Sequence, residues 1–152
     1  MTDASADNTG QPTPVNNDTQ AIIATAVPVA KRLDFLPRHF GKRMMEVENY
    51  IFNRFTTLCK SYRGGYWEFY DLSNGGCYLA LRSQTPLDLD INSNGFQGTV
   101  SADAAGIIVT LFTLCELAFR HENEEIFSTR FHQLRDFATT HAEHALIFQA
   151  ID

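Results

Sequence analysis

The stretch GGYWEFYDLSNGGCYLA, residues 64–80, decides the fold because it has the pattern of a β-hairpin. Asn74-Gly75 separates a run of aromatic residues from a second β-prone run, and this dipeptide is a strong signal for a tight turn. Residues 66–70 contain four aromatic side chains in five positions. Such a cluster is either the middle of a core or a surface on which bases stack, and the register of the hairpin bears on the choice.

Two registers are possible for this hairpin. With a two-residue loop, Trp67 and Phe69 point away from the leucines of the second strand. With a three-residue loop, Trp67 lies beside Leu81 and Phe69 beside Leu79. The outer face then carries Glu68, Tyr70 and Tyr78. The second register separates the apolar side chains of one face from the polar ones of the other more cleanly, so we predict it. Trp67 and Phe69 are then core residues rather than a platform for single-stranded nucleic acid.

A helix is predicted before the hairpin and two strands after it. Across residues 38–62 apolar residues recur in steps of three and four, which predicts an amphipathic helix that ends at Gly64. LDLDI, residues 87–91, alternates apolar and acidic side chains, and FQGTV, residues 96–100, follows the next turn. Two tight hairpins in succession predict an antiparallel four-stranded meander.

The rest of the chain is predicted to be helical. Ser101 has the residue type of an N-cap for a helix over residues 102–120, which is apolar nearly all round and should lie at the centre of the core. A second apolar stripe covers residues 126–138, and a short last helix covers residues 141–150. This order of elements predicts a single-domain α+β fold, in which the meander packs with about four helices.

Composition divides the 152 residues into a tail and one domain. Residues 1–27 are rich in Thr, Asn, Asp and Gln and contain no aromatic residue. We therefore expect residues 1–30 to be a disordered tail and residues 31–152 to be the folded domain. The apolar segment at residues 21–30 is too short to span a bilayer and follows acidic residues, so we expect neither a signal peptide nor a membrane span.

Charge is unevenly distributed, although the net charge is only −6. Residues 31–63 carry eight cations against three acids, a net +5, whereas residues 64–152 carry four arginines against twelve acids, a net −8. The two segments are expected to attract one another within the fold. Alternatively, the basic segment 31–63 faces the phosphates of a nucleic acid, although the overall acidity disfavours broad non-specific binding.

No catalytic or metal site stands out in the sequence. His141 and His144 share one helical face with Glu143 and could bind a metal, but a fourth ligand is missing, so we favour a solvated helix face. The three cysteines are expected to be reduced core thiols of a cytoplasmic protein. No phosphate-binding loop and no nucleophile–base pair is recognisable. We predict no catalytic residue, metal ion or cofactor, and a hydrolase is the least favoured interpretation.

Four segments of the chain resemble the ArdB/KlcA antirestriction proteins of plasmids, mobile islands and phages. They are FLPRHFGKRM (35–44), GGYWEFYDLSNGGCYLA (64–80), NGFQGTVSADAAGI (94–107) and LRDFATTHAEHALIFQAID (134–152). They follow the order of the family, and the aromatic run with SNGG and the SADAAGI motif are the most distinctive. The resemblance implies a small cytoplasmic α+β protein that protects incoming unmodified DNA from type I restriction enzymes, and it carries over no catalytic residue.

Charge limits the mechanism of such a protein. A DNA mimic must present about one negative charge per 1.7 Å of duplex axis, whereas the acids between residues 116 and 136 alternate with arginines. We therefore predict a non-catalytic inhibitor that is not a DNA mimic. It would act on the type I system directly or indirectly, as a monomer or weak dimer. The alternative is a DNA-binding accessory protein that uses residues 31–63, although stable DNA binding is not expected.

The candidate interaction surface consists of polar residues within the family-like segments that flank the hairpin and the start of the central helix. They are Arg38, Glu68, Asp71, Asn74 and Asp103. The fold has little need of these residue types at wet positions, which favours a role in binding. The alternative for each is an ordinary cap, a turn residue or a solvated charge.

Overall fold

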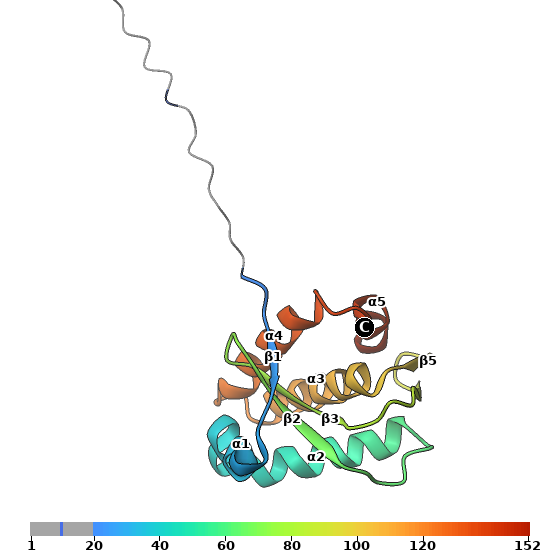
Figure 1. Ribbon diagram of the computed structural model, residues 1–152, viewed down its shortest axis with the longest axis horizontal. Coiled ribbons are helices and arrows are strands. Elements are labelled where there is room, and N and C mark those ends of the chain that lie inside the picture. Colours follow the sequence, from blue (N-terminus) through green and yellow to red (C-terminus); the bar gives the residue numbers. More distant parts are fainter. Residues whose placement is uncertain (1–9, 11–19) are drawn as a thin grey trace, which may run out of the picture.

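The described part of the chain forms an α+β fold with five α-helices and two antiparallel sheets (Figure 1). The computed structural model describes residue 10 and residues 20–152. The strands are β1 (Ala24–Ala26), β2 (Trp67–Leu72), β3 (Cys77–Leu81), β4 (Leu87–Ile91) and β5 (Phe96–Val100). The α-helices are α1 (Arg32–Phe40), α2 (Met44–Leu58), α3 (Ala102–Arg120), α4 (Ile126–Ala138) and α5 (His144–Ile151), and 3-10 turns η1 (Val29–Lys31) and η2 (Gly41–Arg43) flank α1. The predicted α+β class is confirmed.

The strands form two sheets, so the predicted single four-stranded meander is wrong. β1, β2 and β3 pair in that order, and β4 and β5 form a separate hairpin. The reason is that α3 packs against β3, and the Leu79 N–H donates to the Thr110 hydroxyl (3.4 Å) instead of to another strand. A helix thereby covers the edge of β3 that β4 was expected to occupy. Both predicted hairpins nevertheless exist.

The hairpin of β2 and β3 has the predicted register. Trp67 lies opposite Leu81 and Phe69 lies opposite Leu79, which corresponds to the three-residue loop. Trp67 is 7% exposed, so its predicted place in the core is confirmed, whereas Phe69 is half-buried. Tyr78 was expected on the outer face but is buried, because side chains of α3 and α4 contact it there.

Two helices replace the single helix predicted over residues 38–62. α1 begins at Arg32 and ends where Gly41 adopts φ +52°, a left-handed conformation that glycine tolerates. The chain changes direction there before α2 begins. α2 ends at Leu58 rather than at Gly64, because the next residue has an extended backbone that turns the chain toward β2.

Residues 20–30 belong to the folded part, so the predicted tail boundary at residue 30 is wrong. β1 pairs with β2, and further hydrogen bonds extend the pairing. The Val27 N–H donates to the Phe69 carbonyl (2.8 Å), and the Ser73 N–H donates to the Ile23 carbonyl (2.9 Å). The open edge of β2 supplies the partners that composition alone did not reveal. The disorder predicted for residues 1–9 and 11–19 lies outside the described residues.

α3 is the central element of the core and packs against β3, α2, α4 and α5 (Figure 1). Ser101 caps it as predicted, because its Oγ accepts a hydrogen bond from the Ala104 N–H (3.1 Å). Its length and apolar composition would suit a bilayer, but 67% of its most apolar stretch is buried inside the protein, as in a core helix. Gly106 permits the close approach to β3, since a Cβ there would lie 2.3 Å from the Leu79 carbonyl oxygen.

Removing residues 1–27 is expected to destabilise the protein, because β2 loses its partner strand and the core loses the buried Val27 side chain. Burial of one valine alone contributes about 1.5–3 kcal/mol to the free energy of unfolding. The midpoint of urea unfolding should therefore fall. Removal of residues 1–19 is the matched control and should leave the midpoint unchanged. Equal midpoints for the two truncated proteins would contradict a stabilising role of β1.

Candidate functional site

The end of α1 and the strand β2 bring two of the predicted surface residues together. The Arg38 guanidinium forms a bidentate ion pair with the Asp71 carboxylate, with Nη2–Oδ2 at 2.9 Å and Nη1–Oδ1 at 3.2 Å. His39 joins the pair, since its Nε2 lies 2.6 Å from Asp71 Oδ1. Two consecutive residues of α1 therefore hold one carboxylate of β2.

Burial and hydrogen bonds together determine the ionisation of this cluster. Burial lowers the pKa of His39, although the hydrogen bond to Asp71 opposes that shift. Neutral His39 carries its proton on Nε2, because an ionised carboxylate only accepts hydrogen bonds. Partial burial alone would raise the pKa of Asp71, but the hydrogen bonds from Arg38 and His39 outweigh burial and lower it. At neutral pH the cluster is thus a neutral imidazole beside an ionised, paired carboxylate.

A pocket of about 390 Å³ opens beside this cluster. It is lined by Arg38 and His39 of α1, Asp71 and Leu72 of β2, the Gly75-Gly76 turn and Arg130 of α4. We call it the Arg130 pocket. Asn74 lies in the same turn, and its Nδ2 donates to the Gln133 carbonyl (2.9 Å) while Gln133 Nε2 donates back to the Asn74 carbonyl (2.9 Å). Asn74 therefore fixes the turn on α4.

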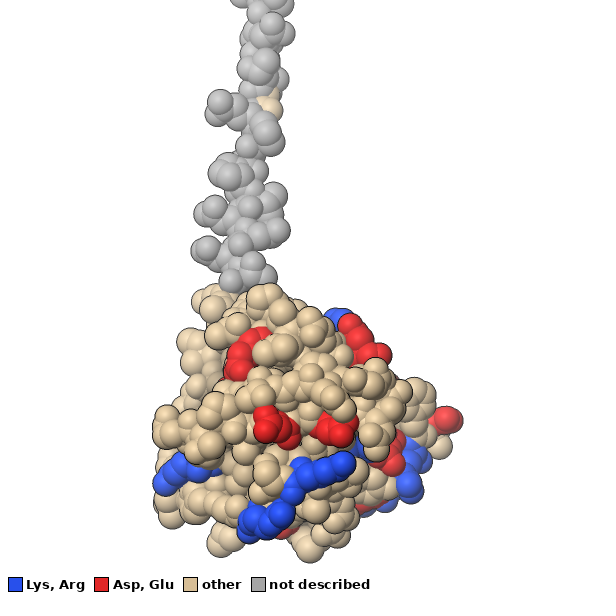
Figure 2. Space-filling model, turned by 90° about the vertical axis from the view of Figure 1, so that its right-hand side faces the viewer, with Lys and Arg blue, Asp and Glu red and all other residues tan. Residues whose placement is uncertain are grey.

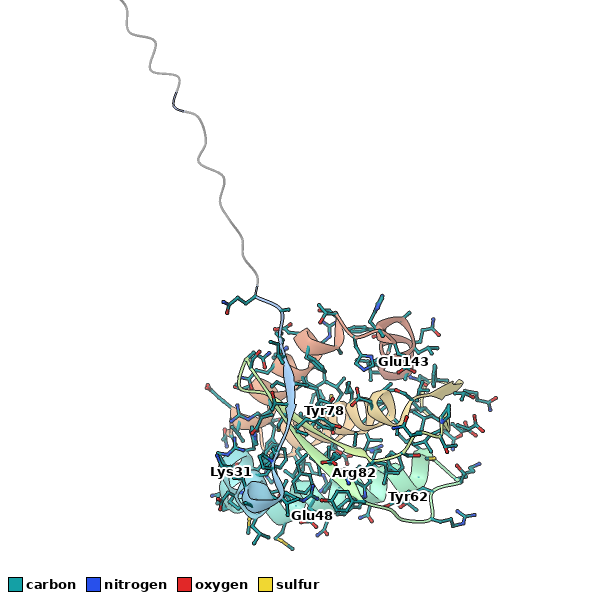
Figure 3. All side chains as sticks on the ribbon, viewed as in Figure 1. Lys31, Glu48, Tyr62, Tyr78, Arg82 and Glu143 are labelled. Atoms are coloured by element: carbon teal, nitrogen blue, oxygen red, sulfur yellow. The ribbon has the colours of Figure 1, made fainter. Side chains whose placement is uncertain are left out.

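Glu68 lies on the opposite face of β2 from Asp71, because side chains alternate along a strand. Its carboxylate accepts a hydrogen bond from Arg82 Nε (2.6 Å) and lies 3.7 Å from Arg32 Nη1 (Arg82 is labelled in Figure 3). Both guanidinium groups lie over the Tyr66 ring, at 4.4 Å and 4.7 Å from its centroid. Only 12% of the Glu68 side chain is exposed. Glu68 thus organises a stack of cations and a ring.

Asp103 connects the start of α3 to β3 and to the segment before α5. It accepts hydrogen bonds from the Tyr78 hydroxyl (2.7 Å) and from His141 Nε2 (2.8 Å). His141 Nδ1 in turn accepts the Glu143 N–H (3.0 Å), so both ring nitrogens have partners. Burial, followed by the charge of Asp103, raises the pKa of Tyr78. Figure 3 shows Tyr78 in the sheet and Glu143 beside α5. Through its hydrogen bonds to Tyr78 and His141, Asp103 links these two regions.

The residues considered for metal or thiol chemistry have structural contacts. His144 Nδ1 donates to the His141 carbonyl (3.1 Å). Within residues 20–152, no group of three His, Cys, Asp or Glu side chains could hold a metal ion. Cys59 and Cys77 are buried, and burial raises the pKa of the Cys77 thiol to about 12. Cys115, expected to lie in the core, is only half-buried.

Ion pairs neutralise most of the basic segment 31–63. Five of its eight cations pair with acids: Arg32 with Glu68, Arg38 with Asp71, Arg43 with Glu46 and Glu124, Arg54 with Glu116, and Lys60 with Asp90. Figure 2 shows small acidic and basic patches interspersed on one face, with uncharged surface around them. The attraction expected between the two segments is therefore present in the fold.

Of the five predicted surface residues, Arg38, Asp71 and Asn74 lie at or beside the Arg130 pocket. The sequence did not single out His39 and Arg130 as members of this site. His39 had one available signal, its position next to Arg38 in a family-like segment. Arg130 had none, since only tertiary packing brings α4 to the hairpin.

Comparisons with known proteins extend over nearly the whole chain. Residues 60–152 match the family model described as antirestriction protein. An antirestriction protein KlcA of Escherichia coli is 44% identical over 142 residues, covering 91% of this chain and 100% of that protein. A second KlcA of Escherichia coli is 46% identical over 138 residues, covering 86% of this chain and 94% of that protein.

A solved structure supports the same relationship. The structure of the KlcA and ArdB proteins matches this fold with a TM-score of 0.81 and 43% sequence identity, covering 90% of this chain and 99% of that chain. Those proteins are described as showing a novel fold and antirestriction activity against type I DNA restriction systems in vivo but not in vitro.

Proposed function

Because this chain belongs to the antirestriction protein family of KlcA and ArdB, we propose that it protects incoming unmodified DNA from type I restriction enzymes. The observation that carries the proposal is its likeness to KlcA and ArdB, whose activity against type I systems is seen in vivo but not in vitro. An inhibitor that acts only inside the cell needs a cellular component in addition to the purified restriction enzyme. The proposed action is therefore indirect, and it takes place in the cytoplasm.

The proposed mechanism is non-catalytic inhibition without imitation of DNA. A mimic needs closely spaced, unpaired negative charges along an axis. In this protein the carboxylates of Glu46, Glu68, Asp71, Glu116 and Glu124 all pair with cations of the basic segment. The same pairs leave few cations of residues 31–63 for phosphates, which disfavours the alternative of a DNA-binding accessory protein. With DNA imitation and DNA binding both disfavoured, we propose that the protein acts by contacting another protein.

We place the interaction surface at the turn end of the hairpin, at Arg38, Asp71 and Asn74, in a monomer or weak dimer. Half of the Arg38 side chain and 37% of the Asp71 side chain are exposed, so a partner can reach both. Glu68 fits this role less well, because only 12% of its side chain is exposed. The Asp103 side chain is 39% exposed, so it stays a candidate at the start of α3.

Expression of this protein should raise the plating of unmodified phage on a strain with a type I restriction system. Plating on an isogenic strain without that system is the control and should not change. The purified protein should not compete with DNA for the purified enzyme, because its acids are not spaced like phosphates. Unchanged plating would overturn the proposed function, and competition in vitro would overturn the indirect mode. Salt-dependent DNA binding would favour the accessory-protein alternative instead.

In the same assay Arg38→Ala should lower protection by about tenfold, because arginines in the centre of an interface often contribute more than about 1 kcal/mol to binding. The double variant Glu122→Gln, Glu125→Gln removes two exposed charges far from the hairpin in sequence and should protect like the parent. Circular dichroism should show that each variant is folded. If Arg38→Ala, Asp71→Ala and Asn74→Ala are folded and all protect fully, the surface lies elsewhere.

A further inference from the structure

The Arg130 pocket contains a cation whose charge is not balanced there. Arg38 pairs with Asp71 at 2.9 Å, and His39 is neutral at neutral pH. No carboxylate within residues 20–152 forms an ion pair with Arg130, whose Nη1 donates to the neutral Gln133 Oε1 (2.9 Å). One positive charge therefore faces the pocket without a counter-charge.

Arg130 also has an unused hydrogen-bond donor. Its Nε is buried and has no hydrogen-bond partner. A buried donor without an acceptor costs free energy and is seldom left in a folded protein. Nε and the adjacent Nη2 form one edge of the planar guanidinium, and such an edge matches two oxygens of a carboxylate or phosphate. Because Nε is buried, the Arg130 side chain must turn toward the pocket to present this edge. An oxyanion bound there would then satisfy the donor and balance the charge together.

The walls of the pocket limit the ligand. Its volume of about 390 Å³ lies within the range of roughly 300–1,000 Å³ that small-molecule sites occupy. The Gly75-Gly76 turn presents backbone alone. It is held against α4, since a Cβ at Gly76 would lie 2.9 Å from Gln133 Cβ. The lining residues include no Phe, Tyr or Trp, so the pocket offers no ring on which a nucleobase could stack.

We propose that the Arg130 pocket binds a compact oxyanion, the phosphate or carboxylate group of a small molecule, at the Nε edge of Arg130. Asp71 does not prevent this, because its oxygens accept hydrogen bonds from Arg38 and His39 that offset its charge. This inference goes beyond the antirestriction function, since binding needs neither DNA nor a restriction enzyme. Each proposal can fail while the other holds.

The direct test is an NMR titration of the full-length protein with inorganic phosphate at constant ionic strength. Chemical shifts should change at the Gly75 and Gly76 amides and at the Arg130 Nε–H. A parallel titration with acetate distinguishes a carboxylate from a phosphate ligand. Adenosine monophosphate should bind no more tightly than phosphate, because the pocket has no aromatic ring on which the adenine base could stack. Shifts confined to other residues, or no saturable shift with either anion, would overturn the proposal.

Substitutions make the test specific. Arg130→Gln should weaken binding of the anion by about tenfold or more, as expected when a hydrogen bond to a charged group is lost. Arg135→Gln is the matched control, because Arg135 lies on the same helix but does not line the pocket. Its guanidinium lies over the Phe148 ring instead, 5.1 Å from the ring centroid. Arg130→Lys keeps the charge without the planar guanidinium, so its affinity for the anion should fall between those of the parent and of Arg130→Gln.

Two outcomes of the substitution experiment would overturn the site at Arg130. One is an Arg130→Gln protein that binds phosphate as tightly as the parent. The other is an Arg135→Gln protein that loses as much affinity as Arg130→Gln, because the effect would then follow net charge. If Arg130→Gln does not fold, the titration of the parent protein still locates the bound anion.

Discussion

Replacing Gly106 by alanine is expected to lower the free energy of unfolding by about 3 kcal/mol or more. A Cβ at this position would lie 2.3 Å from the Leu79 carbonyl oxygen and 2.5 Å from the Ala80 Cβ. Helix propensity alone predicts that the alanine variant is the more stable protein, since alanine is favoured over glycine by about 1 kcal/mol inside a helix. The contact between α3 and β3 involves backbone, so it cannot relax by a change of rotamer.

Urea unfolding followed by circular dichroism measures this effect. Gly10→Ala is the control, because a Cβ at Gly10 meets no atom within 4 Å, and its unfolding midpoint should equal that of the parent. A Gly106→Ala protein as stable as the parent would show that α3 does not approach β3 as closely as described.

Truncating Trp67 to alanine is expected to lower the free energy of unfolding by about 3–5 kcal/mol. Its ring packs edge-on against the rings of Phe55 and Phe52 of α2, with centroids 5.0 Å and 5.1 Å away. Its Nε1–H donates to the Tyr62 hydroxyl (3.1 Å). The alanine variant loses these contacts and leaves a cavity between β2 and α2.

The neighbouring ring provides the comparison for this variant. Tyr66 is 44% exposed, and its main contacts are the guanidinium groups that lie over it. Tyr66→Ala should therefore cost about 1 kcal/mol or less. Equal unfolding midpoints for the two alanine variants would place Trp67 at the surface and restore the interpretation of the aromatic cluster as a stacking platform.

The parts of the fold that the sequence predicts correctly depend on local signals. Asn74-Gly75 marks the hairpin, the alternation of apolar residues sets its register, and Ser101 marks the start of α3. The split into two sheets has no local signal, because it depends on which edge α3 covers. β1 has none either, since the sequence Ala-Thr-Ala becomes a strand only beside the open edge of β2.

The candidate site shows the same division. Arg38 and Asp71 are recognisable as polar residues in family-like segments, and the structure joins them in an ion pair. Their chemistry nevertheless depends on His39 and Arg130, whose roles follow from burial and from the packing of α4 against the turn. Burial and unmatched charge are properties of the folded chain, and no spacing in the sequence encodes them.

The closed edges of the three-stranded sheet have a consequence for the behaviour of the protein at high concentration. α3 covers the outer side of β3, and the strand at the other edge, β1, has only three residues. A strand of a neighbouring molecule therefore finds little free backbone to which it could add. We therefore expect the three-stranded sheet not to seed β-linked aggregates when the protein is strongly expressed.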